Sequence, residues 1–134
     1  MKFSGILVGS ENPEKLKEYY TKLFGKPTFD DDDGGYFGWQ FGEGAVTFGP
    51  HSEVKGKSRE PGRVIWNLET DDVEGEFTKL KGKGATVVKE PYDPAEDSGM
   101  TIATFADPDG NYFQLMSPMD EAAYEKAREM ASKR

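Results

Sequence analysis

The spacing of apolar residues near the N-terminus predicts a strand followed by a helix. Residues 3–8 form a short, continuous apolar run of the kind that builds a buried strand. Asn12 and Pro13 then suit the N-cap and the first position of a helix, and apolar residues recur at helical spacing over 16–24. Gly25 follows directly, which predicts that the helix ends there.

After this helix the chain becomes polar and then alternates. Residues 30–35 are aspartates and glycines, which predict a loop. The segments 36–41 and 45–49 are separated by a short glycine-rich link and predict a hairpin. Residues 51–62 are rich in charged and turn-forming residues and predict an irregular connection.

The second half of the chain repeats this order. The segment 64–70 predicts a strand, and a helix capped by Asp71 or Asp72 follows it. Further strands are predicted over 85–89, 101–106 and 112–116. When the second half is aligned with the first so that Asp72 matches Asn12, the predicted elements of the two halves coincide. We therefore expect two β-α-β-β-β modules of the α+β class.

The length of 134 residues predicts a single domain, and the pattern divides that domain into four parts. These are a first module over 1–50, the connection 51–62, a second module over 63–118 and a C-terminal helix over 119–134. That last helix carries apolar residues on one face and balanced charges elsewhere, so it is expected to pack on the outside of a sheet.

Composition narrows the classes of protein further. The chain has no cysteine, which excludes a disulfide scaffold, a thiolate metal site and a cysteine nucleophile. No apolar run approaches the ~20 residues that span a bilayer, so we expect a soluble, cytoplasmic protein without a membrane partner. The net charge of −8 repels phosphate backbones, so nucleic acid is not an expected partner. The same negative field favours cationic small molecules or serves solubility alone.

Three segments carry a recognisable combination of features. Residues 10–27 form a helix with an aromatic pair followed by a leucine and a glycine, and residues 67–88 form the matching helix of the second half. Residues 105–118 contain the turn Asp-Pro-Asp-Gly-Asn of a terminal hairpin. In this order and spacing, the segments resemble the vicinal oxygen chelate superfamily of glyoxalases, bleomycin-resistance proteins and extradiol dioxygenases.

The resemblance implies a homodimer whose curled sheets enclose a cleft, with a divalent metal held by His or Glu from the first and last strands of each module. Aligned on the helix starts, those positions in this chain are Gly5, Thr47, Ile65 and Gln114. A transition-metal site needs about three His, Cys or carboxylate ligands. None of these residues is of that kind, so we expect neither a metal nor another cofactor.

Two other features suggest chemistry less directly. The acidic run Asp30–Asp33 invites a calcium interpretation, but an EF-hand register would put Phe29 at its first position and Gln40 at its last. A solvated loop is therefore expected. His51 is the sole histidine, and it could serve as an acid–base group, contact a ligand or simply lie at the surface.

Aromatic side chains crowd the strand over 36–41. Alternation puts Phe37, Trp39 and Phe41 on one face and Tyr36 on the other. The larger group either packs in the core or forms a wall on which a planar ligand stacks. Both interpretations stay open, and Trp39 and Phe41 are candidate ligand contacts.

Polar residues lie on one face of the strands 64–70 and 112–116, and the resemblance turns this face toward the cleft. Burying such groups without partners costs about 1–3 kcal/mol each, which favours a ligand or ordered water beside them. Glu69 is the only carboxylate there that we nominate as a general base. The candidate ligand contacts on the strands are Thr47, Asn67, Glu69, Tyr112 and Gln114.

These features favour one function and leave two others open. The first hypothesis is a metal-free small-molecule-binding protein, similar to bleomycin-resistance proteins, that sequesters a cationic or aromatic compound. The second is a lyase, isomerase or dioxygenase of the same superfamily, with a relocated metal site or with metal-free acid–base chemistry at Glu69 or His51. The third is a partner subunit with an empty cleft.

Overall fold

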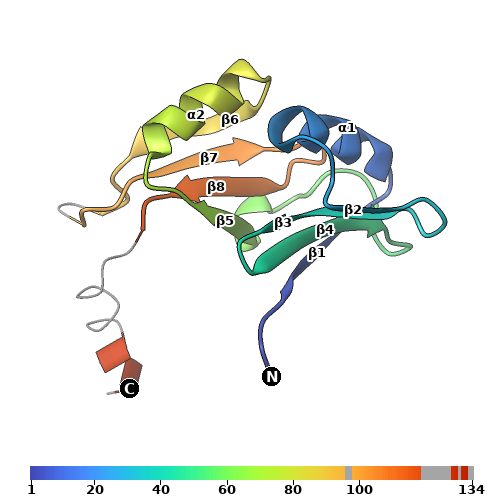
Figure 1. Ribbon diagram of the computed structural model, residues 1–134, viewed down its shortest axis with the longest axis horizontal. Coiled ribbons are helices and arrows are strands. Elements are labelled where there is room, and N and C mark those ends of the chain that lie inside the picture. The colour runs from blue at the N-terminus through green and yellow to red at the C-terminus, as the bar shows by residue number, and fades with distance from the viewer. Residues whose placement is uncertain (96–97, 119–127, 130, 133–134) are drawn as a thin grey trace.

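The computed structural model describes residues 1–95, 98–118, 128–129 and 131–132, and within them the chain forms two modules with the same order of elements (Figure 1). The first module consists of β1 (Gly5–Ser10), α1 (Pro13–Phe24), β2 (Phe29–Asp31), β3 (Tyr36–Phe41) and β4 (Gly44–Pro50). The second follows the 3₁₀ turn η1 (Pro61–Arg63) and consists of β5 (Ile65–Glu69), α2 (Val73–Gly82), β6 (Thr86–Tyr92), β7 (Ile102–Ala106) and β8 (Tyr112–Met116). The predicted α+β class with two β-α-β-β-β modules is confirmed.

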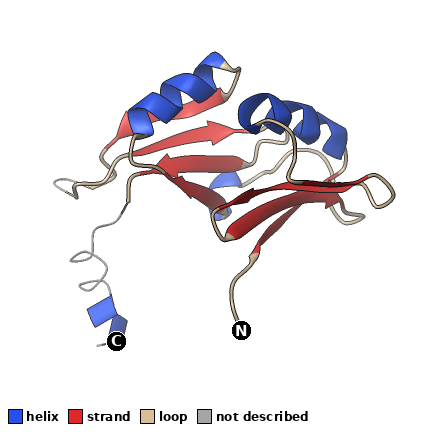
Figure 2. Cartoon of the chain, in the orientation of Figure 1, coloured by secondary structure: helices blue, strands red, loops and turns tan. Residues whose placement is uncertain are grey.

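Each module folds into its own four-stranded sheet, with the first strand beside the last (Figure 2). The strand orders are β1-β4-β3-β2 and β5-β8-β7-β6. β1 pairs with β4, and β5 with β8, in parallel, whereas the remaining neighbours are antiparallel. The two sheets are not closed into a barrel. No helix in the described part of the chain is long and apolar enough to cross a membrane.

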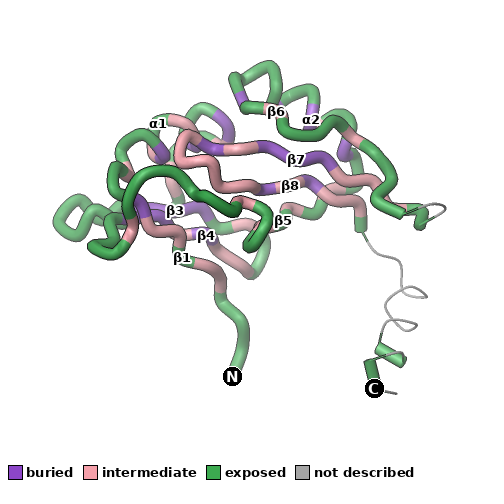
Figure 3. The backbone as a smooth tube through the Cα atoms, turned by 180° about the vertical axis from the view of Figure 1, so that it is seen from behind, coloured by how far each residue is buried: buried purple, intermediate pink, exposed green. Residues whose placement is uncertain are grey.

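Buried residues gather on the inner strands of both sheets (Figure 3). Val46 and Phe48 of β4 are buried, as are Phe113 and Leu115 of β8, and these side chains lie beneath the helices. Because successive side chains of a strand point to opposite sides, their neighbours point away from the helices. We call the first side of each sheet its helix face and the other side its open face.

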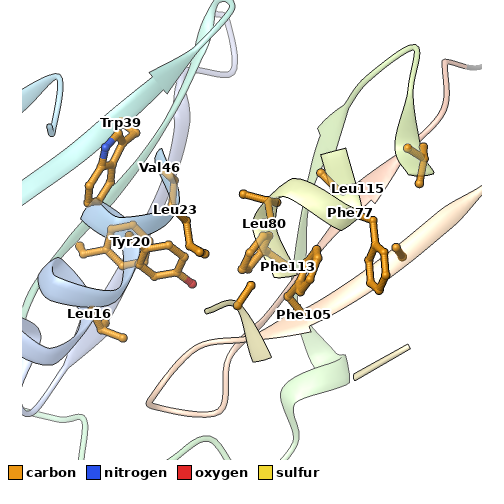
Figure 4. Packing of buried hydrophobic residues seen from close by; sticks show 14 of the residues in the cluster. Leu16, Tyr20, Leu23, Trp39, Val46, Phe77, Leu80, Phe105, Phe113 and Leu115 are labelled. Atoms are coloured by element: carbon orange, nitrogen blue, oxygen red, sulfur yellow. The ribbon is translucent and has the colours of Figure 1, made fainter. Parts of the chain in front are cut away.

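A single hydrophobic core joins the helix faces of both modules (Figure 4). The ring of Tyr20 in α1 stacks on Phe48 of its own sheet, with a centroid distance of 4.6 Å. The same ring lies 5.9 Å from Trp66 and 5.7 Å from Phe113, which belong to the second module. Aromatic pairs at such distances add to the stabilisation from burial alone. Helix α1 is therefore part of both modules.

Hydrogen bonds from α1 also reach the second module. The Tyr20 hydroxyl donates to Oδ2 of Asp107 at 2.8 Å. The Tyr19 hydroxyl donates to the Ala106 carbonyl at 2.8 Å and accepts from the Thr86 backbone N–H at 3.0 Å. Each bond joins positions far apart in sequence, so these contacts fix how the two modules pack.

The acceptor for Tyr20, Asp107, is buried and fully engaged. Its carboxylate also accepts from the backbone N–H groups of Asp109 and Asn111 and from the side-chain amide of Asn111. Burial raises the pKa of Asp107, and burial together with this neighbouring carboxylate raises the pKa of Tyr20 well above its ordinary value. The Ser10 hydroxyl adds a second link by donating to the Asp109 carboxylate at 2.5 Å.

The prediction of a loop over residues 30–35 is wrong for its first two residues, which belong to a strand. Phe29–Asp31 forms the edge strand β2, which pairs with β3 in the register Phe29↔Gly38. Lys17 of α1 lies 2.6 Å from the carboxylate of Asp30 and holds this short strand against the helix. The strand is too short to show alternation, so its existence depends on contacts distant in sequence.

Two further expectations concern the first strand and the C-terminal helix. The first strand was expected over 3–8 but spans Gly5–Ser10, because its parallel pairing with β4 starts at Gly5↔Ala45. The helix expected over 119–134 falls mostly outside the described residues.

Replacing Tyr20 with phenylalanine is expected to lower the free energy of unfolding by about 2 kcal/mol, because it leaves a buried carboxylate oxygen without its hydroxyl donor. Urea denaturation measures the change. Tyr36→Phe is the matched control, since the Tyr36 hydroxyl is exposed and donates to the Pro50 carbonyl at 3.3 Å. The control should change stability by less than about 0.5 kcal/mol. Equal stability of the two variants would show that the Tyr20–Asp107 bond contributes nothing.

Candidate functional site

The four positions at which the resemblance implies metal ligands lie on the open faces of both sheets. By strand alternation, Gly5 and Thr47 lie on the first open face, and Ile65 and Gln114 lie on the second. Glycine has no side chain and isoleucine has only a hydrocarbon one. Threonine and glutamine supply a neutral hydroxyl and a neutral carboxamide. Among the residues that the structure describes, no group of three His, Cys, Asp or Glu side chains could hold a metal ion. The residues present at these positions do not fit the metal.

The surroundings of Gly5 leave no room for a side chain. Its φ angle is 158°, and a Cβ atom placed there would lie 2.0 Å from the carbonyl oxygen of Ala45 in the neighbouring strand. Real atoms do not approach so closely, so any side chain at this position requires the two strands to move apart. A metal ligand at residue 5 is therefore incompatible with the β1–β4 pairing seen here.

The predicted aromatic contacts Trp39 and Phe41 lie on the helix face of β3. Trp39 is 3% exposed, and its indole Nε1 donates to the Gly25 carbonyl at 2.9 Å. Phe41 is half-buried, and its ring meets Phe24 of α1 edge-on at a centroid distance of 5.1 Å. Of the two interpretations kept for this group, core packing describes Trp39, and it accounts for the contact that Phe41 makes with α1.

The open face of the first sheet carries two aromatic side chains, Tyr36 of β3 and Phe29 of β2. Tyr36 lies over Gly49, where an added Cβ would come within 2.1 Å of the ring, and Phe29 lies over Gly38, where the distance would be 2.4 Å. Tyr36 is 36% exposed and Phe29 40%. We call these two rings the aromatic platform. The glycines at positions 38 and 49 are the sequence signal, because a glycine inside a strand often marks a close approach of another group.

The surroundings of the platform are partly apolar and partly acidic. Leu7 pairs with Thr47 on this open face, and Thr47 and Tyr36 both line a shallow hollow of about 480 Å³ formed by the first sheet. Asp31 pairs with Tyr36 in the β2–β3 ladder, which puts a carboxylate beside the exposed ring. The structure thus brings Thr47 together with aromatic residues rather than with metal ligands.

The open face of the second sheet carries a row of neutral polar groups. Asn67 pairs with Gln114 between β5 and β8, and the Thr104 hydroxyl contacts Oε1 of Gln114 at 3.3 Å. Tyr112 pairs with Ile65 in the same ladder. The structure therefore brings Asn67, Tyr112 and Gln114 together, on a different sheet from Thr47.

Of the two acid–base candidates, Glu69 follows Asn67 on the same face of β5 and lines a groove with it, whereas His51 belongs to the end of the first module. Glu69 is exposed at the end of β5, where it borders a groove of about 820 Å³ between the end of α1 and α2. His51 is exposed just after β4, and its Nδ1 accepts a hydrogen bond from the Glu53 backbone N–H at 3.2 Å. That bond forms a local turn and gives His51 a structural role.

Two mixed sheets, each covered by one helix, define an α+β protein with a duplicated β-α-β-β-β module. Residues 5–116 match the sequence profile described as Glyoxalase-like domain. The chain belongs to this family, within the vicinal oxygen chelate superfamily.

Several solved structures share the fold. A glyoxalase-related enzyme from Fulvimarina pelagi is 17% identical, with a TM-score of 0.67 and 88% of each chain covered. A glyoxalase/bleomycin resistance protein/dioxygenase family enzyme from Burkholderia phytofirmans PsJN is 19% identical, with a TM-score of 0.65, covering 87% of this chain and 98% of that one. TnmS3, an antibiotic binding protein from Streptomyces sp. CB03234, is 22% identical, with a TM-score of 0.66 and coverage of 88% and 96%. Such identities show the fold alone. No curated protein sequence matches the chain.

Gly5→Ala is expected to lower the free energy of unfolding by roughly 2 kcal/mol or more, because the added methyl group collides with the Ala45 carbonyl. Gly82→Ala is the matched control, since an added Cβ at the end of α2 meets nothing within 4 Å. The control should be neutral or stabilising by up to about 1 kcal/mol. Thermal or urea denaturation compares the two, and a fully stable Gly5→Ala protein would mean that residue 5 can accept a side chain.

Proposed function

We propose that this protein binds a cationic, planar small molecule on the open face of its first sheet, without a metal. The observation that carries the proposal is the aromatic platform, in which Tyr36 and Phe29 lie directly over glycines and stay more than a third exposed. Rings buried only for stability would be covered, as Trp39 is. Exposed rings on a rigid strand suit stacking with a planar ligand at little entropic cost.

The positive charge of the ligand follows from the electrostatics around the platform. Asp31 flanks Tyr36, and the whole chain carries a net charge of −8. A cation above an aromatic face gains from the ring's electron density, and a nearby carboxylate strengthens that attraction. The structural relative TnmS3 is an antibiotic binding protein, which supports a binding role for a protein of this fold.

We also propose a homodimer in which a second copy covers the open faces. Leu7 is 57% exposed in the middle of the first open face, beside the platform. The second sheet offers Asn67, Gln114 and Tyr112 as hydrogen-bonding groups on its own open face. A partner that covers both faces would shield a ligand on the platform from water and bring these polar groups into use.

Tyr36→Ala is expected to weaken the binding of 9-aminoacridine, a planar cation, by about fivefold or more, because the stacking surface is lost. Isothermal titration calorimetry measures the dissociation constant. Tyr36→Phe retains the ring and should bind as the unmodified protein does. Anthracene-9-carboxylate, which has a similar ring system but a negative charge, should bind more weakly than the cation. Absence of 9-aminoacridine binding, or equal binding by Tyr36→Ala, would contradict the proposal.

Leu7→Lys is expected to convert a dimer into single chains, because a charged ammonium group would be buried without a partner in the interface. Light scattering after size exclusion should give twice the chain mass of 14.9 kDa for the unmodified protein and the single mass for the variant. Thr78→Lys, at an exposed position of α2 on the helix side of the molecule, should leave the dimer intact. A monomeric unmodified protein would refute the dimer and leave the platform as an open site.

A further inference from the structure

The chain contains two Asp-Gly peptide bonds and no Asn-Gly bond. Asp33-Gly34 lies in the turn between β2 and β3, and Asp109-Gly110 lies in the turn between β7 and β8. A glycine after an aspartate has no side chain to shield its backbone nitrogen, and its conformational freedom lets that nitrogen approach the preceding carboxyl group. The fold places these two chemically equal bonds in very different surroundings.

The bond Asp109-Gly110 is held in place by its neighbours. The Asp109 carboxylate accepts a hydrogen bond from the Ser10 hydroxyl at 2.5 Å, and the Gly110 N–H donates to the Asp107 carbonyl at 2.9 Å. The Asp109 carbonyl accepts from the Ser58 N–H at 2.8 Å. The carboxyl group and the nitrogen that would have to meet are thus both engaged elsewhere. A reaction between them requires this turn to open first.

The bond Asp33-Gly34 has no such protection. Both residues are exposed, in a turn that projects from the end of the first sheet (Figure 1). The turn is closed through Asp31, whose carbonyl accepts from the Gly35 N–H at 2.8 Å and whose carboxylate accepts from the Asp33 N–H at 3.1 Å. Within the described residues, neither the Asp33 carboxylate nor the Gly34 N–H makes a hydrogen bond. These two groups can therefore meet without breaking another contact.

We propose that Asp33 is a modification site at which the chain isomerises to isoaspartate, with water as the only co-reactant. The Gly34 nitrogen attacks Cγ of the protonated Asp33 carboxyl group, and the new N–C bond closes a five-membered succinimide ring. The hydroxyl group leaves with the proton of the nitrogen, as water. A second water then adds to the ring. When it cleaves the bond between the nitrogen and the original main-chain carbonyl carbon, isoaspartate results, with the same mass and oxidation state as aspartate.

Isoaspartate changes the shape of the turn, because the main chain then runs through Cβ and Cγ and gains one carbon. Asp31 pairs with Tyr36 at the end of the β2–β3 ladder, so the turn closes directly beside the aromatic platform. The lengthened turn cannot keep the hydrogen bond from Gly35, and β2 has only three residues with which to hold Phe29 over Gly38. Isomerisation is therefore expected to weaken ligand binding on the platform. That consequence rests on the function proposed above, whereas the isomerisation itself does not.

The chemical test is prolonged incubation of the folded protein at physiological temperature, followed by digestion with trypsin and mass spectrometry with electron-transfer fragmentation. The two bonds fall in separate peptides, 23–55 and 90–126. Isoaspartate should accumulate at Asp33 at least about tenfold faster than at Asp109, because the hydrogen bonds of Asp109 must break first. In concentrated guanidinium chloride, where those bonds are absent, the two positions should react at similar rates.

Two exposed variants serve as matched controls. Asp33→Glu keeps the charge but would have to close a larger ring, so isoaspartate should no longer form at this position. Asp32→Glu leaves the Asp33-Gly34 bond intact and should isomerise as the unmodified protein does. Absence of isoaspartate at Asp33, or equal rates at Asp33 and Asp109 in the folded protein, would overturn the proposal.

The consequence for the platform is measured separately. After incubation, calorimetric titration with 9-aminoacridine should show that the fraction of intact binding sites has fallen by the fraction of isoaspartate found by mass spectrometry. Asp33→Glu protein incubated in the same way should keep all of its sites. Unchanged binding by isomerised protein would refute the effect on the platform. If fresh protein does not bind 9-aminoacridine, the proposed function fails, and the mass spectra alone decide whether Asp33 isomerises.

Discussion

The buried carboxylate of Asp107 is the contact on which the arrangement of the two modules depends. It belongs to the terminal hairpin of the second module, yet it accepts the hydroxyl of Tyr20 from the helix of the first. In a low-dielectric interior such a bond is strong, and its loss leaves a charge with too few donors. The aromatic core around Tyr20 then packs against both sheets at once. Together with the hydrogen bonds of Tyr19, this contact sets how the two modules pack.

The chain has the superfamily's fold but not the metal donors that the resemblance implies. The positions matched to those donors carry Gly5, Thr47, Ile65 and Gln114. At Gly5 the neighbouring strand leaves no room for a side chain. The open faces carry glycines with rings above them and neutral amides, groups that suit stacking and hydrogen bonding better than metal coordination.

Most of the fold could be predicted from the sequence because its elements have strong local signals. The helices show their period over several turns, and the hairpins are marked by glycine-rich turns. β2 lacked such a signal, since three residues cannot show alternation and the contact between Lys17 and Asp30 is not local. The cavity between β1 and β5 is likewise produced only when distant strands come together.

The site was less predictable, for a geometric reason. Alternation correctly grouped Phe37, Trp39 and Phe41 on one face of β3 but could not tell which face the helix covers. The answer depends on the register Phe37↔Phe48, which also places Tyr36 beside Gly49. Once the register is known, the glycines explain where the rings lie. The polar row of Asn67 and Gln114 was easier to predict, because both strands alternate clearly between apolar and polar residues.

The parallel pairing of the first and last strands in each module has a consequence for synthesis. While a ribosome is still making the second half, β1 can join β4, since residues 5–50 are already available. Helix α1 cannot complete its contacts, however, because the acceptor for Tyr20 arrives only with residue 107. A nascent first module therefore leaves part of its aromatic core uncovered until residue 107 has been made. Apolar surface exposed during synthesis in this way favours aggregation.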